Sequence, residues 1–178
     1  MTPFLHKTDG DASMREGEVA LASDPADLPG DAHVIFIGHV HSPWTNRDDC
    51  PKNMNRARER DGGDALVEID TEFRPGLAGL EAASHVIILT WLNLTPRNLI
   101  VQKPRHTPHP KGVFSIRSPA RPNPVGLHIA RLVALNLAAG RLTLDAIDVV
   151  DGTPVIDVKP YYASIDSFPD AVTERHGK

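Results

Sequence analysis

Residues 126–137 read GLHIARLVALNL, residues 141–150 read RLTLDAIDVV, and Ala138, Ala139 and Gly140 lie between them. Both runs are dominated by apolar residues and include the β-branched side chains that strands prefer. Gly140 can take the positive φ that a tight turn needs, because it has no Cβ. The two runs therefore predict a β-hairpin.

Further strands are expected on both sides of this hairpin, in short apolar or alternating runs at residues 33–40, 66–73, 84–92 and 154–161. The run at 84–92 is continuously apolar, which predicts a strand buried on both faces. Short helices are expected only at residues 55–60 and 77–83. Five or six strands with few helices favour a barrel or sandwich over a doubly wound sheet, and the glycine-rich fingerprint of a dinucleotide-binding domain is absent.

Three regions are expected along the chain. Residues 1–31 are polar, acidic and interrupted by prolines, which is typical of an N-terminal arm. Residues 32–165 hold all the predicted strands and form the β domain, and residues 166–178 form a C-terminal tail. The proline-rich, basic stretch at 96–111 is expected to be a loop, in which short regular structure is possible but none is assigned.

Composition narrows the class of protein. The chain has 178 residues, of which 40% are hydrophobic and 24% charged, as in an ordinary globular domain. The longest apolar run, at residues 86–92, is far shorter than the roughly 20 residues of a membrane span. A single cysteine, Cys50, excludes an internal disulfide. With no secretory signal, a cytoplasmic location and no membrane contact are expected.

Charge is distributed unevenly along the chain. The net charge is −4, yet residues 82–144 contain eight Lys or Arg side chains and no Asp or Glu, so the remaining residues carry 11 basic and all 23 acidic side chains. Such a block can steer a polyanion such as RNA. Alternatively, its basic side chains pair with acidic ones elsewhere in the fold.

The first distinctive motif is GVFSIRSPARPNPVG at residues 112–126. Its prolines restrict φ and lower the entropy cost of ordering the loop. Such a loop can hold the guanidinium groups of Arg117 and Arg121 ready to bind a carboxylate or phosphate. The alternative is that both arginines only bind backbone carbonyls of the loop, but the unusual packing of Arg, Pro and Asn favours ligand binding.

The second motif is DVVDGTPVIDVKPY at residues 148–161. Asp148, Asp151 and Asp157 flank a predicted turn at residues 151–153. The turn lies between apolar strands, so its polar groups are expected at a barrel rim, with backbone N–H groups pointing outward to a ligand. An ordinary Asp-Gly turn is the alternative.

Histidine and cysteine offer weaker candidates. His85 opens an apolar run, where a histidine is more often structural than a ligand. His39, His41, His106 and His109 lack the spacing of a metal site, so no metal is expected. Cys50 has no base implied by the sequence and is expected to be an incidental thiol.

The residues 112–126 resemble the signature of the TrmO (YaeB-like) family of tRNA methyltransferases. Other features occur in that family's order, and together they cover residues 33–162: Gly38 with Ser42 and Pro43, Pro51 to Asn53, residues 76–81 before Ser84 and His85, and the motif at 148–161. Two long motifs in the correct order make this resemblance specific.

The resemblance implies a compact β-barrel that works as a dimer and uses S-adenosylmethionine. The expected fold is thus a small closed or partly open β-barrel with few short helices and an N-terminal arm. The implied reaction is methyl transfer to N6 of threonylcarbamoyladenosine, the modified tRNA base just 3′ of the anticodon. The implied cofactor-binding residues are Pro51, Lys52, Asn53, His85, Arg117, Asp151, Gly152 and Thr153.

The acceptor N6–H must lose its proton, so a carboxylate or histidine within hydrogen-bond reach is required. The catalytic candidates are Asp148 and Asp151, with His85 behind them. The basic side chains expected to bind tRNA phosphates are Lys103, Arg105, Lys111 and Arg121.

One departure from the family is visible. Pro51-Lys52-Asn53 stands where the family usually has Pro-Arg-Gln, which loses a planar guanidinium and shortens an amide. Two alternatives therefore remain: a methyltransferase of the same fold acting on a small molecule or another RNA, and a barrel that binds cofactor or RNA without catalysis.

Overall fold

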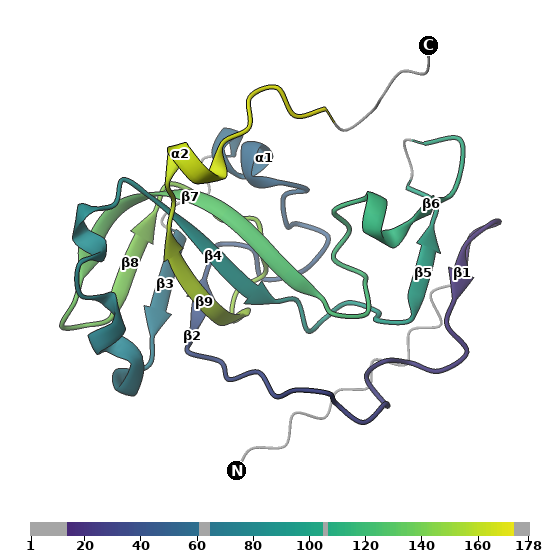
Figure 1. Ribbon diagram of the computed structural model, residues 1–178, viewed down its shortest axis with the longest axis horizontal. Helices are drawn as coiled ribbons and strands as arrows, with labels where there is room; N and C mark the ends of the chain where they lie inside the picture. The colour runs from purple at the N-terminus through teal and green to yellow at the C-terminus, as the bar shows by residue number, and fades with distance from the viewer. Residues whose placement is uncertain (1–13, 61–64, 105–106, 173–178) are drawn as a thin grey trace. The chain divides into compact units, whose positions relative to one another are not determined.

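The structure is a computed structural model that describes residues 14–60, 65–104 and 107–172 (Figure 1). The described residues form two compact units. One consists of the described residues up to Pro29 together with Thr95–Pro124, and the other of Gly30–Leu94 together with residues 125–172. Each unit is considered by itself below.

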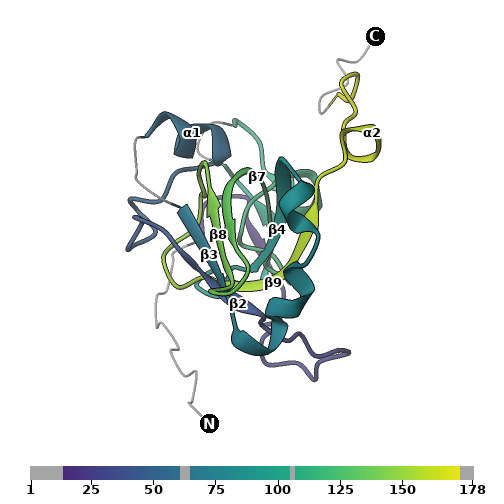
Figure 2. The same cartoon turned by 90° about the vertical axis from the view of Figure 1, so that its left-hand side faces the viewer.

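The larger unit is a closed, six-stranded barrel. Its strands are β2 (Gly38–His41), β3 (Ala65–Ile69), β4 (His85–Trp91), β7 (Val125–Asn136), β8 (Arg141–Leu144) and β9 (Pro154–Pro160). Around the barrel they follow the order β2-β3-β8-β7-β4-β9, every neighbouring pair is antiparallel, and β9 closes the ring on β2. Figure 2 shows these strands after a quarter turn. The predicted mainly β barrel with few short helices is confirmed.

The predicted hairpin is formed by β7 and β8. Asn136 lies opposite Arg141, and the ladder continues to Leu132 opposite Leu144, with an irregularity before Ala134. Gly140 has φ 69°, and a Cβ there would lie 2.6 Å from the carbonyl oxygen of Ile69. Both the left-handed backbone and the close approach therefore require glycine at this turn.

The core lies inside the barrel and follows the two-residue period of its strands. On β3 the inward side chains are Ala65, Val67 and Ile69, and on β4 they include Val86 and Ile88. The residues of the opposite face of β4, His85, Ile87, Leu89 and Trp91, are only partly buried. The prediction that this strand is buried on both faces is therefore wrong, because the second sheet face of a small barrel is its outer surface.

Several predicted strands are longer than the observed ones. β2 begins at Gly38, and the preceding Val34 and Ile35 are 49% and 68% exposed. β3 ends at Ile69, because a 3-10 helix, η1 (Thr71–Leu77), follows it. β8 ends at Leu144 because residues 145–153 leave the ladder and lead to β9. Apolar runs thus overestimate strand length in two cases: where apolar side chains pack under a connection, as Ile147 and Val149 do, and where they stay exposed, as Val34 and Ile35 do.

Helices are short. The predicted helix at 55–60 is confirmed as α1 (Met54–Glu59), and the helical region predicted at 77–83 corresponds to the end of η1 and to η2 (Leu80–Ala82). A further turn, α2 (Ala163–Asp166), follows β9. Arg58 joins α1 to the barrel, since it donates to Asp145 Oδ2 (2.8 Å) and to the Ile129 carbonyl (2.9 Å).

The smaller unit contains a three-stranded antiparallel sheet in the order β1-β5-β6. Its strands are β1 (Val19–Ala20), β5 (Leu99–Gln102) and β6 (Lys111–Gly112), followed by the 3-10 helix η3 (Val113–Ser115). The stretch at residues 96–111, for which the sequence left short structure open, therefore contains β5 and the start of β6. Part of the N-terminal region supplies β1, because two strands alone would leave the edge of β5 unpaired.

Within the described parts of the chain, no helix has the length and hydrophobicity needed to cross a membrane.

Candidate functional site

Two connections between strands meet at one end of the barrel, which we call the loop end. It comprises the last residues of β2, β4 and β8 and the first residues of β3, β7 and β9, as the antiparallel registers require. The connection from β2 contains residues 51–53, and the connection into β9 contains Asp148 and residues 151–153. Most of the predicted site residues of the larger unit therefore lie at the loop end.

The turn at Asp151 joins the two connections. The backbone N–H of Ser42 donates to Asp151 Oδ1 (3.0 Å), and the Ser42 hydroxyl donates to the Val149 carbonyl (2.7 Å). Trp44 donates its indole N–H to the Ile147 carbonyl (2.8 Å). Gly152 has φ 77°, and a Cβ there would meet no atom within 4 Å. These hydrogen bonds fix the base of the turn, whereas the space around Gly152 at its tip is open.

The backbone N–H groups of this turn point inward, which corrects the prediction that they face a ligand. Asp151 N–H donates to Trp44 O (2.8 Å), Gly152 N–H to Val40 O (2.9 Å) and Thr153 N–H to Val150 O (3.2 Å). The Thr153 hydroxyl also donates to Val150 O (2.6 Å), and Thr153 is buried. What the turn offers to a ligand is the Asp151 carboxylate, whose side chain is 48% exposed.

Asp148 lies deeper and has a histidine partner. Its Oδ1 is 2.6 Å from Nδ1 of His128, and Nε2 of that histidine is 2.9 Å from the Thr90 hydroxyl. Thr90 and His128 point into the barrel from β4 and β7 and are buried, whereas the Asp148 side chain is 16% exposed. The carboxylate thus stands between a buried polar pair and the loop end.

The segment 51–53 begins helix α1. Asn53 is its N-cap, and Asn53 Oδ1 accepts from the Arg56 N–H (3.0 Å), as asparagine does well at this position. Pro51 is buried and Lys52 is exposed. The asparagine that departs from the family pattern therefore has a structural task as the helix N-cap, and both it and Lys52 are exposed to solvent.

Cys50 lies beside Asp148 and is held as a thiol. The pKa of Cys50 is raised to about 11, chiefly by burial and also by the charge of Asp148, while Arg60 acts in the opposite direction. A thiol that is protonated at neutral pH is a poor nucleophile, which agrees with the expected incidental role.

His85 lies at the far end of its strand. It precedes Thr90 by five residues, roughly 16 Å along β4, and it is one of the partly buried outer residues of that strand. Its Nδ1 is 3.0 Å from the Ser84 hydroxyl, and its ring lies 6.3 Å from that of Tyr161. The barrel therefore does not bring His85 together with Asp148 and Asp151.

The remaining predicted residues belong to the smaller unit. Arg121 donates to the carbonyls of Ser118 (2.8 Å), Val113 (3.3 Å) and Ile116 (2.5 Å), which is the loop-stabilising alternative. Thr95, Arg97 and Gln102 donate to further carbonyls of the same proline-rich loop, at Pro119, Pro122 and Ala120. These bonds make the loop that carries Arg117 well ordered.

The predicted phosphate-binding lysines are Lys103 and Lys111. The backbone N–H of Lys103 donates to Glu18 Oε1 (2.9 Å), and Lys111 lies opposite Gln102 at the start of β6. Hydrogen bonds from the backbone N–H groups of Lys103 and Arg15 lower the pKa of Glu18, so this carboxylate is firmly ionised beside the basic segment. The fourth predicted phosphate ligand, Arg105, lies outside the described residues.

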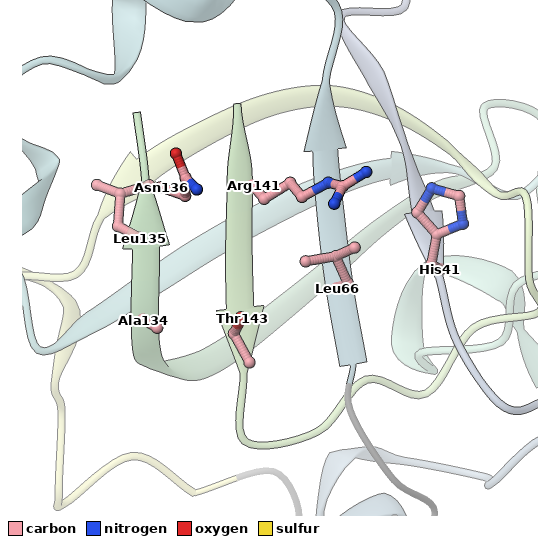
Figure 3. Close-up of a pocket in the computed structure, with 7 residues that line it drawn as sticks. All are labelled: His41, Leu66, Ala134, Leu135, Asn136, Arg141 and Thr143. Carbon is pink, nitrogen blue, oxygen red and sulfur yellow. The ribbon is translucent and has the colours of Figure 1, made fainter. Parts of the chain in front are cut away.

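A shallow pocket of about 470 Å³ lies on the outer surface of the barrel (Figure 3). It is lined by His41, Leu66, Ala134, Leu135, Asn136, Arg141 and Thr143, none of them a predicted site residue. Arg141 is paired there with Glu68 (Nε–Oε2 3.0 Å). His41 connects the pocket to the loop end, because its Nδ1 is 3.8 Å from Asp151 Oδ1.

The chemistry of the loop end fits S-adenosylmethionine in charge. This molecule carries a sulfonium and an ammonium group, and two carboxylates, Asp148 and Asp151, stand on one connection with different exposure. Opposite charges attract strongly where water is partly excluded. Among the described residues, no group of three or more His, Cys, Asp and Glu is arranged to hold a metal ion.

Sequence reasoning missed His128 and Thr90. Each is a polar residue within an otherwise apolar strand, and this was the only sign in the sequence that it could be functional. It was not decisive, because only the pairing of β4 with β7 shows that both side chains enter the barrel at the same level, with Thr90 opposite Gly126 and Ile88 opposite His128.

The closed β-barrel is not a dinucleotide-binding fold, and two carboxylates, Asp148 and Asp151, stand at one of its ends. Residues 39–167 match the family model of the tRNA-methyltransferase O N-terminal domain. The chain therefore belongs to the TrmO family of tRNA methyltransferases, and the predicted family is confirmed.

Individual relatives and solved structures agree with this family assignment. A probable S-adenosyl-L-methionine-binding protein of Methanothermobacter thermautotrophicus is 42% identical over 74% of this chain and 91% of its own length. The tRNA (adenine(37)-N6)-methyltransferase of Escherichia coli is 34% identical over 76% of this chain. The crystal structure of TrmO from Pseudomonas aeruginosa superposes with a TM-score of 0.64 at 31% identity, over 81% of this chain.

Coverage of the longer relatives is partial. This chain spans 60% of the length of the Escherichia coli enzyme and 62% of the solved Pseudomonas aeruginosa chain. The activity and partners of those whole proteins are accordingly treated below as a proposal for this chain.

Proposed function

We propose that this protein is an S-adenosylmethionine-dependent tRNA (adenine-N6)-methyltransferase, and that its substrate is threonylcarbamoyladenosine beside the anticodon. The observation that carries the proposal is the family match over residues 39–167, which contains the loop-end carboxylates. The names of two relatives, one a probable S-adenosyl-L-methionine-binding protein and the other a tRNA adenine-N6 methyltransferase, support the cofactor and the acceptor class.

In this proposal the chain's own residues bind the cofactor, orient the methyl donor and acceptor, and accept a proton. S-adenosylmethionine supplies an electrophilic methyl group on a sulfonium sulfur. Asp151, the more exposed carboxylate, attracts the cationic ligand, and Asp148 accepts the proton of the N6–H group. Holding donor and acceptor in line accounts for much of the rate of such a displacement. An anticodon loop allows the target base to leave its stack at a low cost.

Arg117, Lys52 and the turn at 151–153 remain the proposed cofactor-binding residues of this chain. Purified protein should bind S-adenosylmethionine in a calorimeter. Replacing Arg117 with Gln should weaken binding by roughly 1.5–3 kcal/mol if its guanidinium makes a charge-assisted hydrogen bond to the cofactor. No binding heat for the unmodified protein at millimolar cofactor would contradict the proposal.

The decisive experiment is methylation of two tRNA preparations, one carrying threonylcarbamoyladenosine and one carrying unmodified adenosine. With labelled S-adenosylmethionine, the first should gain a methyl group on N6 and the second should not, as read by mass spectrometry of digested nucleosides. Nucleosides from a strain lacking the gene should lack the same methylated base. Methylation of another nucleoside or of a small molecule would support the runner-up reaction instead, and cofactor binding without transfer would support a non-catalytic barrel.

We further propose a homodimer that acts on tRNA in the cytoplasm. Closed twofold pairs are the commonest assembly of single-domain chains, and a second subunit could bring His85 to a site that its own barrel end does not reach. Sedimentation of the full chain should give twice the monomer mass at micromolar concentration. A monomer under these conditions would contradict the assembly but not the reaction.

A further inference from the structure

The barrel interior is apolar except at the loop end, where Thr90 and His128 enter it. The side chains that surround the core are aliphatic, and within the described residues no buried side-chain polar atom is left without a hydrogen-bond partner. Placing a hydroxyl and an imidazole in such an interior costs free energy unless both are satisfied. The pair is satisfied only as a chain of bonds that ends at Asp148.

An ionised Asp148 beside a neutral His128 ring assigns the donors and acceptors of this chain of bonds. Asp148 is an acceptor when ionised, so His128 donates from Nδ1–H across 2.6 Å. In the neutral ring Nε2 is then an acceptor, and the Thr90 hydroxyl donates to it across 2.9 Å. A hydroxyl, an imidazole and a carboxylate thus hold one another in fixed orientations.

The signature motif contributes to this arrangement. Its last residue, Gly126, lies opposite Thr90 on the neighbouring strand. A Cβ at position 126 would collide with the Thr90 hydroxyl oxygen and would lie 2.6 Å from Nε2 of His128. Glycine at this position therefore leaves the space in which the bond between Thr90 and His128 forms.

We propose that His128 and Thr90 are positioning residues that orient Asp148 as the proton acceptor of the methyl transfer. This inference rests on the proposed function. His128 occupies Oδ1 of Asp148, which leaves Oδ2 for the N6–H group of the substrate. In the reaction the N–H bond breaks and its proton goes to Oδ2. The nitrogen electron pair forms the N–CH₃ bond, and the C–S bond breaks with its electrons on sulfur, which becomes a neutral thioether.

Other charged groups around Asp148 fit this role. Cys50 lies near it as a protonated thiol, since burial and the charge of Asp148 both raise the pKa of Cys50. Arg60, at the end of α1, is the cation whose charge reaches the same thiol, and it contacts the ring of Trp44 at 5.8 Å. Within the described residues, the hydrogen bond from His128 is therefore the contact that orients the carboxylate.

Two amide variants of His128 test the roles of its two ring nitrogens separately. In H128N the amide can stand near the Nδ1 position and still donate to Asp148, whereas in H128Q it stands near Nε2 and reaches Thr90 only. The kcat of H128Q should fall by about tenfold to a hundredfold, part of the ~10²–10⁴-fold usually lost with a general base, while H128N should lose clearly less. KM for both substrates and calorimetric affinity for S-adenosylmethionine should change less than threefold, about 0.6 kcal/mol.

Three controls complete the design. D148N should lose at least as much kcat as H128Q, and T90S should retain more activity than T90V, which lacks the hydroxyl. H33Q, the same change at an exposed histidine, should match the wild type in activity and stability. In the free wild-type protein, ¹⁵N NMR of the His128 ring should show a protonated Nδ1, and T90V should disturb that signal.

The outcomes are distinguishable. If wild-type protein methylates tRNA and H128Q keeps its kcat, or if H128N and H128Q lose kcat equally, the positioning role is wrong and the pair is only structural. A ring protonated at Nε2 alone would also overturn it. If the wild type binds cofactor but methylates no tRNA, the proposed function fails, and the NMR result then judges the geometry by itself.

Discussion

At the scale of single residues, the carboxylates of the loop end differ according to their partners. Asp148 has His128, Asp151 has the Ser42 N–H, and Asp145 has Arg58 together with the Arg131 N–H. Burial disfavours the charged form of Asp145, but the hydrogen bonds and charges of Arg58 and Arg131 outweigh it and lower its pKa below the usual 3.8. Asp145 is therefore a structural anion, whereas the other two are available for chemistry.

Replacing Asp145 with Asn should lower the free energy of unfolding at pH 7 by about 1–3 kcal/mol, because Arg58 loses its partner. A carboxyl whose pKa is lowered by folding stabilises the protein above its unfolded pKa, and this contribution disappears as the pH falls through the folded pKa. The difference between variant and wild type should therefore shrink below pH 3.8. Urea titrations at pH 7 and at the lowest pH where both proteins fold measure it.

A matched control is Asp157→Asn, which removes the surface pair with Lys159. It should cost at most about 1 kcal/mol, since exposed ion pairs contribute little. Equal losses of unfolding free energy in the two variants would mean that the pair between Asp145 and Arg58 of α1 stabilises the protein no more than an exposed ion pair does.

At the scale of elements, tight turns decide the path of the chain between strands. Gly140 and Gly152 both have positive φ, 69° and 77°, yet their surroundings differ. A Cβ at position 140 would lie 2.6 Å from Nε of Arg74 and from Ile69 O, whereas one at position 152 would meet nothing within 4 Å. The hairpin turn is thus limited by packing as well as by φ, and the turn at the loop end by φ alone.

Gly152→Ala should therefore cost about 1–2 kcal/mol of stability, the usual penalty of a left-handed backbone. Gly140→Ala should cost more, because the ladder between β3 and the hairpin must also shift. Thermal unfolding of both variants measures the difference, with Gly76→Ala as the control, since a Cβ there meets no atom within 4 Å and φ is ordinary. A smaller loss at position 140 than at 152 would contradict the close approach.

At the scale of the whole molecule, the acid-free stretch of residues 82–144 is used in two ways. In the barrel, Arg141 pairs with Glu68 and Arg131 lies beside Asp145, which is the internal pairing allowed by the sequence. In the smaller unit, Arg97 and Arg121 donate to loop carbonyls. The residues that remain as proposed phosphate ligands are Lys103, Arg105 and Lys111.

Neutralising those three residues together should flatten the slope of log affinity against log salt for tRNA by up to about three, because each phosphate contact releases counterions. Filter binding or fluorescence anisotropy between about 50 and 200 mM salt measures the slope. The control neutralises Arg15, Arg56 and Lys159, which form ion pairs with Glu18, Glu59 and Asp157. A slope that is unchanged by the first triple variant would assign the basic block to pairing within the protein.

The strand-rich pattern, the hairpin around Gly140 and the two motifs were enough to predict the barrel and the family, because turn chemistry and two-residue periodicity are local properties of the chain. Strand ends were predicted too far out at residues 33–37, where Val34 and Ile35 are exposed, and at residues 145–150, where Ile147 and Val149 pack beneath a connection instead of in a strand.

Only the tertiary structure brought Thr90, His128 and Asp148 together, from two strands and a connection far apart in sequence. It also turned the N–H groups of residues 151–153 inward and placed His85 at the far end of β4. Register across the barrel decides which side chains meet, and register depends on pairing between distant strands, which no short stretch of sequence specifies.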